Sequence, residues 1–132
     1  MFNQTKALTI AGWVIAGLLA LPLTFSAIMK FLYPPDMAEQ WVGKFGYPEK
    51  FAFAIGVVEL SCLILYLVPR TATLGAVLLT GYLGGAVATH LRVNDAFVPP
   101  IVVGIFVWLG LYLRDPRIRT LLPLRQPPPD KT

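Results

Sequence analysis

Four apolar runs alternate with short polar connections along this chain of 132 residues. The runs cover residues 7–33, 51–67, 72–91 and 97–113. Each has about 17 residues or more, enough for a helix to cross the hydrocarbon core of a bilayer. Because lipid offers no partner to backbone polar groups, such runs form helices rather than open strands. The pattern predicts an all-α protein, an integral membrane four-helix bundle.

Two regions follow from this pattern: a four-span transmembrane domain at 1–115 and a basic, proline-rich cytoplasmic tail at 116–132. A cleaved signal peptide is a poorer interpretation of the first run. That run is too long, and it ends at Lys30 and a Pro-Pro pair rather than at small residues that suit cleavage.

The connection at 33–50 has its own pattern, with apolar residues every four positions. Asp36 and Glu39 resemble a capping box at its start, and Gly46 is expected to end it. We predict a short amphipathic helix at the outer interface, with Trp41 at the level of the lipid head groups. A second interpretation makes this helix and Trp41 an interfacial lid over a cavity.

Composition supports the membrane assignment. Hydrophobic residues make up 56% and charged residues 14%, whereas soluble domains are about a quarter charged. Basic residues are more numerous on one side of the predicted spans, which places both termini in the cytoplasm. The seven on that side are Lys6, Arg70, Arg114, Arg117, Arg119, Arg125 and Lys131. No basic patch interleaves with aromatic residues on a soluble face, so a nucleic acid partner is not expected.

The chemistry available to a single chain is limited. Cys62 is the only cysteine and His90 the only histidine, so no disulfide, structural zinc site or bis-histidine haem is expected within one chain. No pair of nucleophile and base is legible either, and a self-sufficient enzyme is the least favoured interpretation.

Glu59 is the only acidic or basic residue in the run at 51–67. A helical rise of about 1.5 Å per residue puts its carboxylate near the middle of the membrane. A charge at that depth costs a few kcal/mol even on lenient insertion scales, so such residues usually face the interior of a bundle and have a partner.

Lys30 and His90 are the candidate partners of Glu59. Both lie near the outer ends of their spans, and the tilt of each Cα–Cβ bond toward its helix N-terminus points the three side chains toward one another. Helical phase adds Tyr66 and Tyr82 to the same interior. We therefore predict a polar core of Lys30, Glu59, His90, Tyr82 and Tyr66 that binds the head of a small molecule.

A structural role remains open beside this functional one. Lys30 and Glu59 would then form an ion pair that sets the register of the bundle. Similarly, Pro22, Ser26 and Lys30 share one helical face. They form either a polar stripe that points inward or a packing kink beside a lysine at the membrane edge.

Gly81 and Gly85 form a G-x-x-x-G motif in the third run, which permits close approach of two helices. Packing inside one bundle and a homo-oligomer seam are both compatible with it.

The chain resembles the DoxX-like family of small four-helix bacterial membrane proteins. The resemblance lies in IGVVELSCLILYLVPR at 55–70 and LGAVLLTGYLGGAVATHLR at 74–92. Lys30-Phe31 and the FGYP sequence at 45–48 also fit. The tail beyond Arg114 lies outside the resemblance.

The resemblance implies a multi-pass protein of the bacterial inner membrane, with Lys30, Glu59 and His90 as its polar core. Some relatives are associated with quinol or thiosulfate oxidation or with membrane oxidoreductase complexes. The expected function is therefore an accessory or anchor subunit that binds a quinone- or lipid-like molecule for a partner oxidoreductase. A proton-coupled transporter acting as an oligomer and a structural assembly factor without a ligand are the alternatives.

Overall fold

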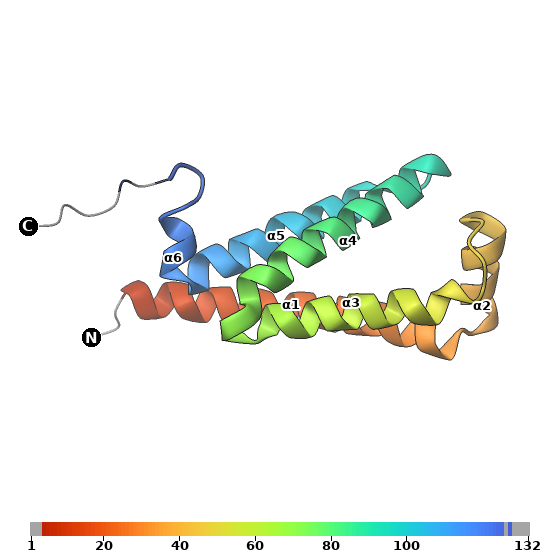
Figure 1. Cartoon of the computed structure of the whole chain (residues 1–132), viewed down its shortest axis with the longest axis horizontal. Helices are drawn as coiled ribbons and strands as arrows, with labels where there is room; N and C mark the ends of the chain where they lie inside the picture. Colours follow the sequence, from red (N-terminus) through yellow and green to blue (C-terminus); the bar gives the residue numbers. More distant parts are fainter. Residues whose placement is uncertain (1–3, 126, 128–132) are drawn as a thin grey trace, which may run out of the picture.

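The described residues form four long helices joined by short connections (Figure 1). The structure is a computed structural model, and it describes residues 4–125 and 127. Its elements are α1 (Gln4–Leu32), α2 (Pro35–Ala38), the π-helical η1 (Glu39–Lys44), α3 (Phe51–Leu67), the 3₁₀ turn η2 (Pro69–Thr71), α4 (Ala72–Arg92), α5 (Val98–Arg114) and α6 (Pro116–Arg119). No strand occurs among these residues, which confirms the predicted all-α class.

Each predicted apolar run forms one long helix with ends close to those expected. Two helical segments, Thr5–Leu32 and Pro69–Arg92, are long and apolar enough to cross a membrane. The other two, Phe51–Leu67 and Val98–Arg114, are apolar but shorter.

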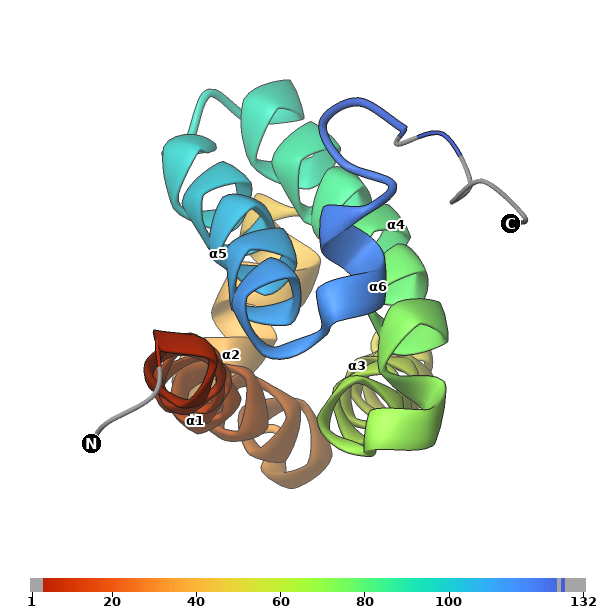
Figure 2. The ribbon, with the colours of Figure 1, turned by 90° about the vertical axis from the view of Figure 1, so that its left-hand side faces the viewer.

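The four long helices are arranged in a ring. α1 packs against α3 and α5, and α4 packs against the same two helices from the other side (Figure 2). The start of α1 and all of α6 lie at one end of the molecule, here named the terminus end (Figure 1). Residues 33–50 and 93–97 lie at the opposite end, here named the loop end.

Apolar side chains occupy both the inside and the outside of this ring. The outward-facing ones include Leu18, Leu21 and Phe25 on α1, which are 63%, 70% and 63% exposed. Soluble monomers rarely leave so much contiguous apolar surface uncovered, whereas lipid covers it readily. The buried core comprises Ala16, Leu19, Leu23, Cys62, Leu63, Tyr66, Ala72, Ala76, Leu79, Leu83, Val107, Leu111 and Ile118.

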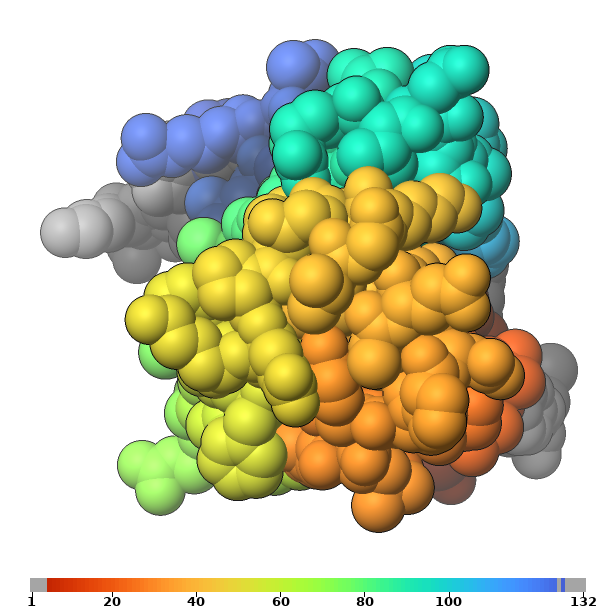
Figure 3. All heavy atoms as spheres, turned by 90° about the vertical axis from the view of Figure 1, so that its right-hand side faces the viewer, coloured from red at the N-terminus to blue at the C-terminus, as the bar shows by residue number. Residues whose placement is uncertain are grey.

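The helices separate toward the loop end. In Figure 1 the α4–α5 pair diverges from the α1–α3 pair in that direction. Seen from the loop end in Figure 3, the connection between α1 and α3 covers much of the molecule. The connection thus covers the end of the molecule at which the two helix pairs have separated.

The predicted short helix is present but begins differently from the expected capping box. Pro34 is the N-cap, no side chain caps the helix, and Asp36 lies within the first turn. The capping-box prediction is wrong because the Pro34–Pro35 pair itself starts the helix, so that Asp36 lies two residues beyond the N-cap position. The expected stop is confirmed, since Gly46 follows with a φ of 73°.

Backbone contact between α3 and α4 depends on Gly75. A Cβ atom at this position would lie 2.2 Å from the backbone nitrogen of Tyr66. The η2 turn brings the two helices together, and Thr71 Oγ1 supports it by donating to the carbonyl oxygen of Leu65 at 2.8 Å. The absence of a side chain at Gly75 therefore allows the start of α4 to lie against the end of α3.

Arg114, the last residue of α5, lies between helices at the terminus end. The residue is buried, with only 9% of its surface exposed. The guanidinium carbon lies 4.3 Å from the centre of the Trp13 ring and 4.5 Å from that of Tyr66. Two aromatic faces thus stabilise the cation and join α5 to α1 and α3.

The predicted tail begins with α6, and Ile118 from this helix is part of the buried core. Residues 126 and 128–132 of the predicted tail lie outside the described residues.

Candidate functional site

Lys30 and Glu59 form a buried ion pair between α1 and α3. Lys30 Nζ lies 2.8 Å from Glu59 Oε2, and the two side chains are 10% and 1% exposed. Ser26 Oγ accepts a hydrogen bond from Lys30 Nζ at 2.7 Å and donates to Glu59 Oε2 at 3.3 Å. The predicted stripe on α1 therefore points inward at Ser26 and Lys30, and three polar groups satisfy one another.

Helix geometry explains how these groups meet. Ser26 and Lys30 lie one turn apart on α1, and Gly56 lies just before Glu59 on α3. A Cβ atom on Gly56 would lie 2.8 Å from Phe31 Cε1 and 3.1 Å from Lys30 Cβ. The missing side chain lets α1 approach α3 closely enough for Lys30 to reach the carboxylate.

Tyr82 adds a third helix to this site. It projects from α4, packs against the buried core, and interacts electrostatically with the Glu59 carboxylate. Cys62 is buried near Glu59 on the same face of α3. We name Ser26, Lys30, Glu59 and Tyr82 the polar cluster.

The structure does not bring His90 into the polar cluster. His90 Nδ1 lies 2.7 Å from the carbonyl oxygen of Ala86, and Nε2 lies 3.8 Å from Asp95 Oδ2. The imidazole also meets the Phe45 ring edge-on, with centroids 5.2 Å apart. Since the carbonyl can only accept, Nδ1 carries the proton of this hydrogen bond.

Height along the helix explains this placement. His90 lies eight residues beyond Tyr82, or about 12 Å at the helical rise. α4 has by then diverged from α3 (Figure 1). The two histidine nitrogens therefore contact Ala86 and Asp95 rather than Glu59.

His90 belongs instead to a set of contacts that hold residues 34–48 to the end of α4. Lys44 Nζ lies 3.0 Å from Asp95 Oδ2. Arg92 donates to the carbonyl oxygen of Phe45, and the hydroxyls of Tyr47 and Thr89 bond to each other. This attachment bridges the gap between the two diverging helix pairs.

Acidification is expected to loosen this attachment. The hydrogen bond from Lys44, with that from the backbone of Ala96, holds the pKa of Asp95 below its ordinary value of 3.8. A lowered folded-state pKa contributes stability above the unfolded pKa, and this is lost as the pH falls through the folded value. Hydrogen exchange of residues 34–48, corrected for intrinsic rates, should accelerate below about pH 4.

Asp95→Asn is the control for this pH dependence. The variant should show faster exchange in residues 34–48 at neutral pH and no further acceleration from this source on acidification. An identical pH profile in both proteins would contradict the role of Asp95.

Tyr66 also lies apart from the polar cluster. Its hydroxyl donates to the carbonyl oxygen of Val107 at 2.7 Å, and its ring faces Arg114. Tyr66 is seven residues beyond Glu59, or about 10 Å further along α3. It therefore contributes to the terminus end of the core.

Trp41 is buried within the connection at the loop end, being only 5% exposed. Its Nε1 donates to the carbonyl oxygen of Pro48 at 2.9 Å, and its ring packs on Tyr47 with centroids 5.0 Å apart. The indole thus holds the connection in its folded shape.

Gly81 and Gly85 face outward from α4. Both are exposed, and a Cβ atom at either position would have nothing within 4 Å. Among the described residues, no helix packs on this face, so the close approach that the motif permits is not used within the chain.

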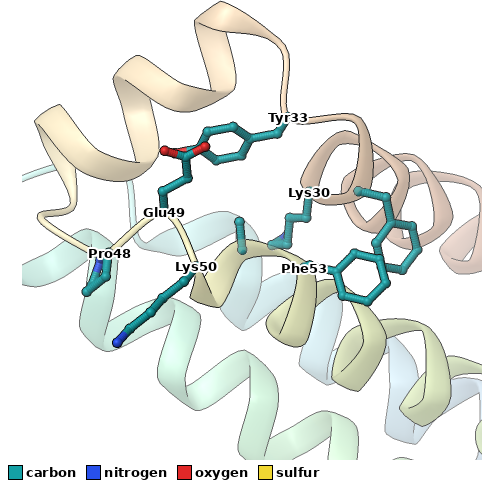
Figure 4. A pocket seen from close by; sticks show the side chains of 8 residues that line it. Lys30, Tyr33, Pro48, Glu49, Lys50 and Phe53 are labelled. Atoms are coloured by element: carbon teal, nitrogen blue, oxygen red, sulfur yellow. The ribbon is translucent and has the colours of Figure 1, made fainter.

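A groove of about 640 Å³ adjoins the polar cluster at the loop end. Figure 4 shows it between the end of α1 and the start of α3. Its lining residues are Lys30, Phe31, Tyr33, Pro48, Glu49, Lys50, Ala52 and Phe53. Lys30 thus belongs to both the groove and the buried ion pair.

Sequence reasoning missed Tyr33 and Glu49 in this groove. Tyr33 follows the end of α1 with a φ of 50°, and it precedes the Pro34–Pro35 pair, which cannot continue that helix. The Pro34–Pro35 pair was the available signal. For metals, the part of the chain that the structure describes contains no group of three or more His, Cys, Asp or Glu side chains that could hold an ion.

Comparison with known proteins gives one result. A search of curated proteins and a search of solved structures each returned no significant match. A model of the DoxX-like family matches residues 14–110, a stretch that runs from α1 into α5 and includes the polar cluster and His90. This match confirms the resemblance seen in the sequence, and the chain belongs to the DoxX-like family.

Proposed function

We propose that all four long helices cross the bacterial inner membrane, with both termini in the cytoplasm. The exposed apolar side chains of α1 support this orientation in lipid. The excess of basic residues at the terminus end supports the placement of that end in the cytoplasm.

Within the membrane, the protein binds the polar head of a quinone- or lipid-like molecule for a partner oxidoreductase. One observation carries this proposal: Lys30 lines an open groove and is also bonded to the buried Glu59. A group that enters the groove would therefore meet a charged, hydrogen-bonded network. A pair that only sets helix register has no need of such an opening.

Lys30, the member of the polar cluster that lines the groove, would hold the head of the ligand, and Ser26, Glu59 and Tyr82 would orient Lys30 from behind. Lys30 is a hydrogen-bond donor, Glu59 an acceptor, and the hydroxyls of Ser26 and Tyr82 serve as either. We assign electron transfer to the partner protein, and the outward face of α4 at Gly81 and Gly85 is the surface on which we place a partner helix.

The test is the amount of ligand retained by Glu59→Gln, which keeps the size of the side chain but removes its charge. Purified protein in lipid nanodiscs would be extracted, and quinones and lipids quantified by mass spectrometry. We expect about tenfold less bound ligand than in the wild-type protein, since charge-assisted hydrogen bonds contribute about 1.5–3 kcal/mol.

Glu39→Gln is the matched control, because Glu39 is exposed on η1 and belongs neither to the polar cluster nor to the lining of the groove. It should retain wild-type ligand. Wild-type protein that binds no quinone or lipid-like ligand, even after addition of a decyl-substituted benzoquinone, would exclude the proposed function.

A further inference from the structure

The groove at the loop end has a polar and an apolar part. Its volume of about 640 Å³ lies within the usual range for small-molecule sites, about 300–1,000 Å³. Lys30, Tyr33 and Glu49 supply polar atoms, while Phe31 and Phe53 pack together with ring centroids 5.1 Å apart. This division suits a ligand with a polar head and an apolar body.

Two hydrogen-bond donors at the groove have unused capacity. Lys30 Nζ carries three N–H groups, and its bonds within the described residues go to Ser26 and Glu59. The hydroxyl oxygen of Tyr33 is enclosed but has no hydrogen-bond partner among those residues. Enclosure and the nearby Glu49 carboxylate raise the pKa of Tyr33, so its hydroxyl stays protonated and able to donate.

The charges around the groove disfavour an anionic head. The charge of Lys30 is balanced by Glu59 at 2.8 Å. Figure 4 shows Glu49 reaching toward the Tyr33 ring, while Lys50 extends away from Lys30 and Phe53. The Lys50 ammonium lies instead 5.2 Å from the centre of the Phe51 ring. An entering anion would therefore meet the Glu49 carboxylate, while the ammonium of Lys50, which also lines the groove, points away from Lys30 and Phe53.

The apolar part of the groove continues onto the outer surface of α1 and α3. Phe53 is 63% exposed and Leu32 is 69% exposed. In the proposed membrane orientation, these side chains contact lipid. A ligand tail can therefore remain in the bilayer while its head occupies the groove.

We propose that this groove binds the uncharged head of an amphiphile whose oxygens accept hydrogen bonds from Lys30 Nζ and the Tyr33 hydroxyl. The ring or body of the ligand lies against Phe31 and Phe53. This inference rests on the proposed function and adds the location, the donors and the charge of the ligand.

The experiment measures binding of a decyl-substituted benzoquinone to the full-length protein in nanodiscs of an uncharged lipid. Tyr33→Phe removes one donor and should weaken the affinity about fivefold, as expected for one hydrogen bond. Tyr112→Phe removes a hydroxyl on α5 outside the groove and should leave the affinity unchanged.

A second comparison tests the charge of the ligand. Dodecanoate, an anion with a similar tail, should bind the wild-type protein at least tenfold more weakly than the quinone. Glu49→Gln should reduce that difference by removing the carboxylate from the wall. Because this comparison does not use the Tyr33 variant, it tests the groove even if that variant fails to fold.

The outcomes separate the groove from the proposed function. Equal quinone affinity in the Tyr33→Phe and Tyr112→Phe variants, or preferred binding of dodecanoate, would overturn the groove assignment. Loss of quinone binding in Glu59→Gln would still support the proposed function in that case. Wild-type protein that binds neither probe would overturn both.

Discussion

Replacing Glu59 with leucine is expected to lower the free energy of unfolding by about 3–5 kcal/mol. The substitution leaves the ammonium of Lys30 buried without its counter-charge, and it also removes an acceptor from Ser26. Reversible unfolding in mixed micelles, followed by helix content, would measure the change.

The double variant Lys30→Met with Glu59→Leu distinguishes loss of the pair from loss of packing. Replacing both charges by apolar side chains of similar volume is often neutral or stabilising, so we expect most of the lost free energy to be recovered. A double variant as unstable as Glu59→Leu alone would show that the ion pair is not the cause.

Replacing Gly75 with alanine is expected to destabilise the bundle by about 3 kcal/mol, the upper end of the usual cost of overpacking. The added Cβ would meet backbone atoms of Leu65 and Tyr66, and backbone cannot rotate away as a side chain can. The start of α4 must therefore shift from α3. The same unfolding experiment measures the effect.

Gly81→Ala is the matched control on the same helix. Its Cβ would have nothing within 4 Å, and alanine favours helix over glycine by about 1 kcal/mol. The variant should be equal to or slightly more stable than the wild-type protein in isolation. Similar losses at Gly75 and Gly81 would contradict the described contact between α3 and α4.

The sequence predicted the helices and the Lys30–Glu59 pair for related reasons. Apolar runs of sufficient length define the helices, and a carboxylate within such a run requires a partner. Lys30 meets this need because α1 and α3 are adjacent and Gly56 lets them approach.

The same reasoning failed to place His90. Direction and helical phase put His90 on the correct face of α4, but they do not reveal that α4 diverges from α3. The rise of about 12 Å along α4 from Tyr82 to His90 then keeps the imidazole away from Glu59. The partners of His90 are consequently Asp95 and Phe45, from segments whose position sequence periodicity does not predict.

Glycine spacing was similarly incomplete as a guide. G-x-x-x-G singled out Gly81 and Gly85, yet the close approach within the chain occurs at Gly75. Gly75 makes the contact because the η2 turn determines which face of α4 lies against α3. A motif identifies residues that permit contact but not the helix that makes it.

The unequal lengths of the helices have a consequence for the surrounding lipid. α1 has 29 residues and α3 has 17, or about 43 Å and 25 Å at the helical rise. Figure 1 shows α1 reaching past the end of α3 at the terminus end. In the proposed membrane orientation, with a hydrocarbon core about 30 Å thick, α1 would have to tilt or project, while the bilayer would thin beside α3. The protein would therefore sit in an annulus of uneven thickness, with the shortest acyl chains gathered around its shorter helices.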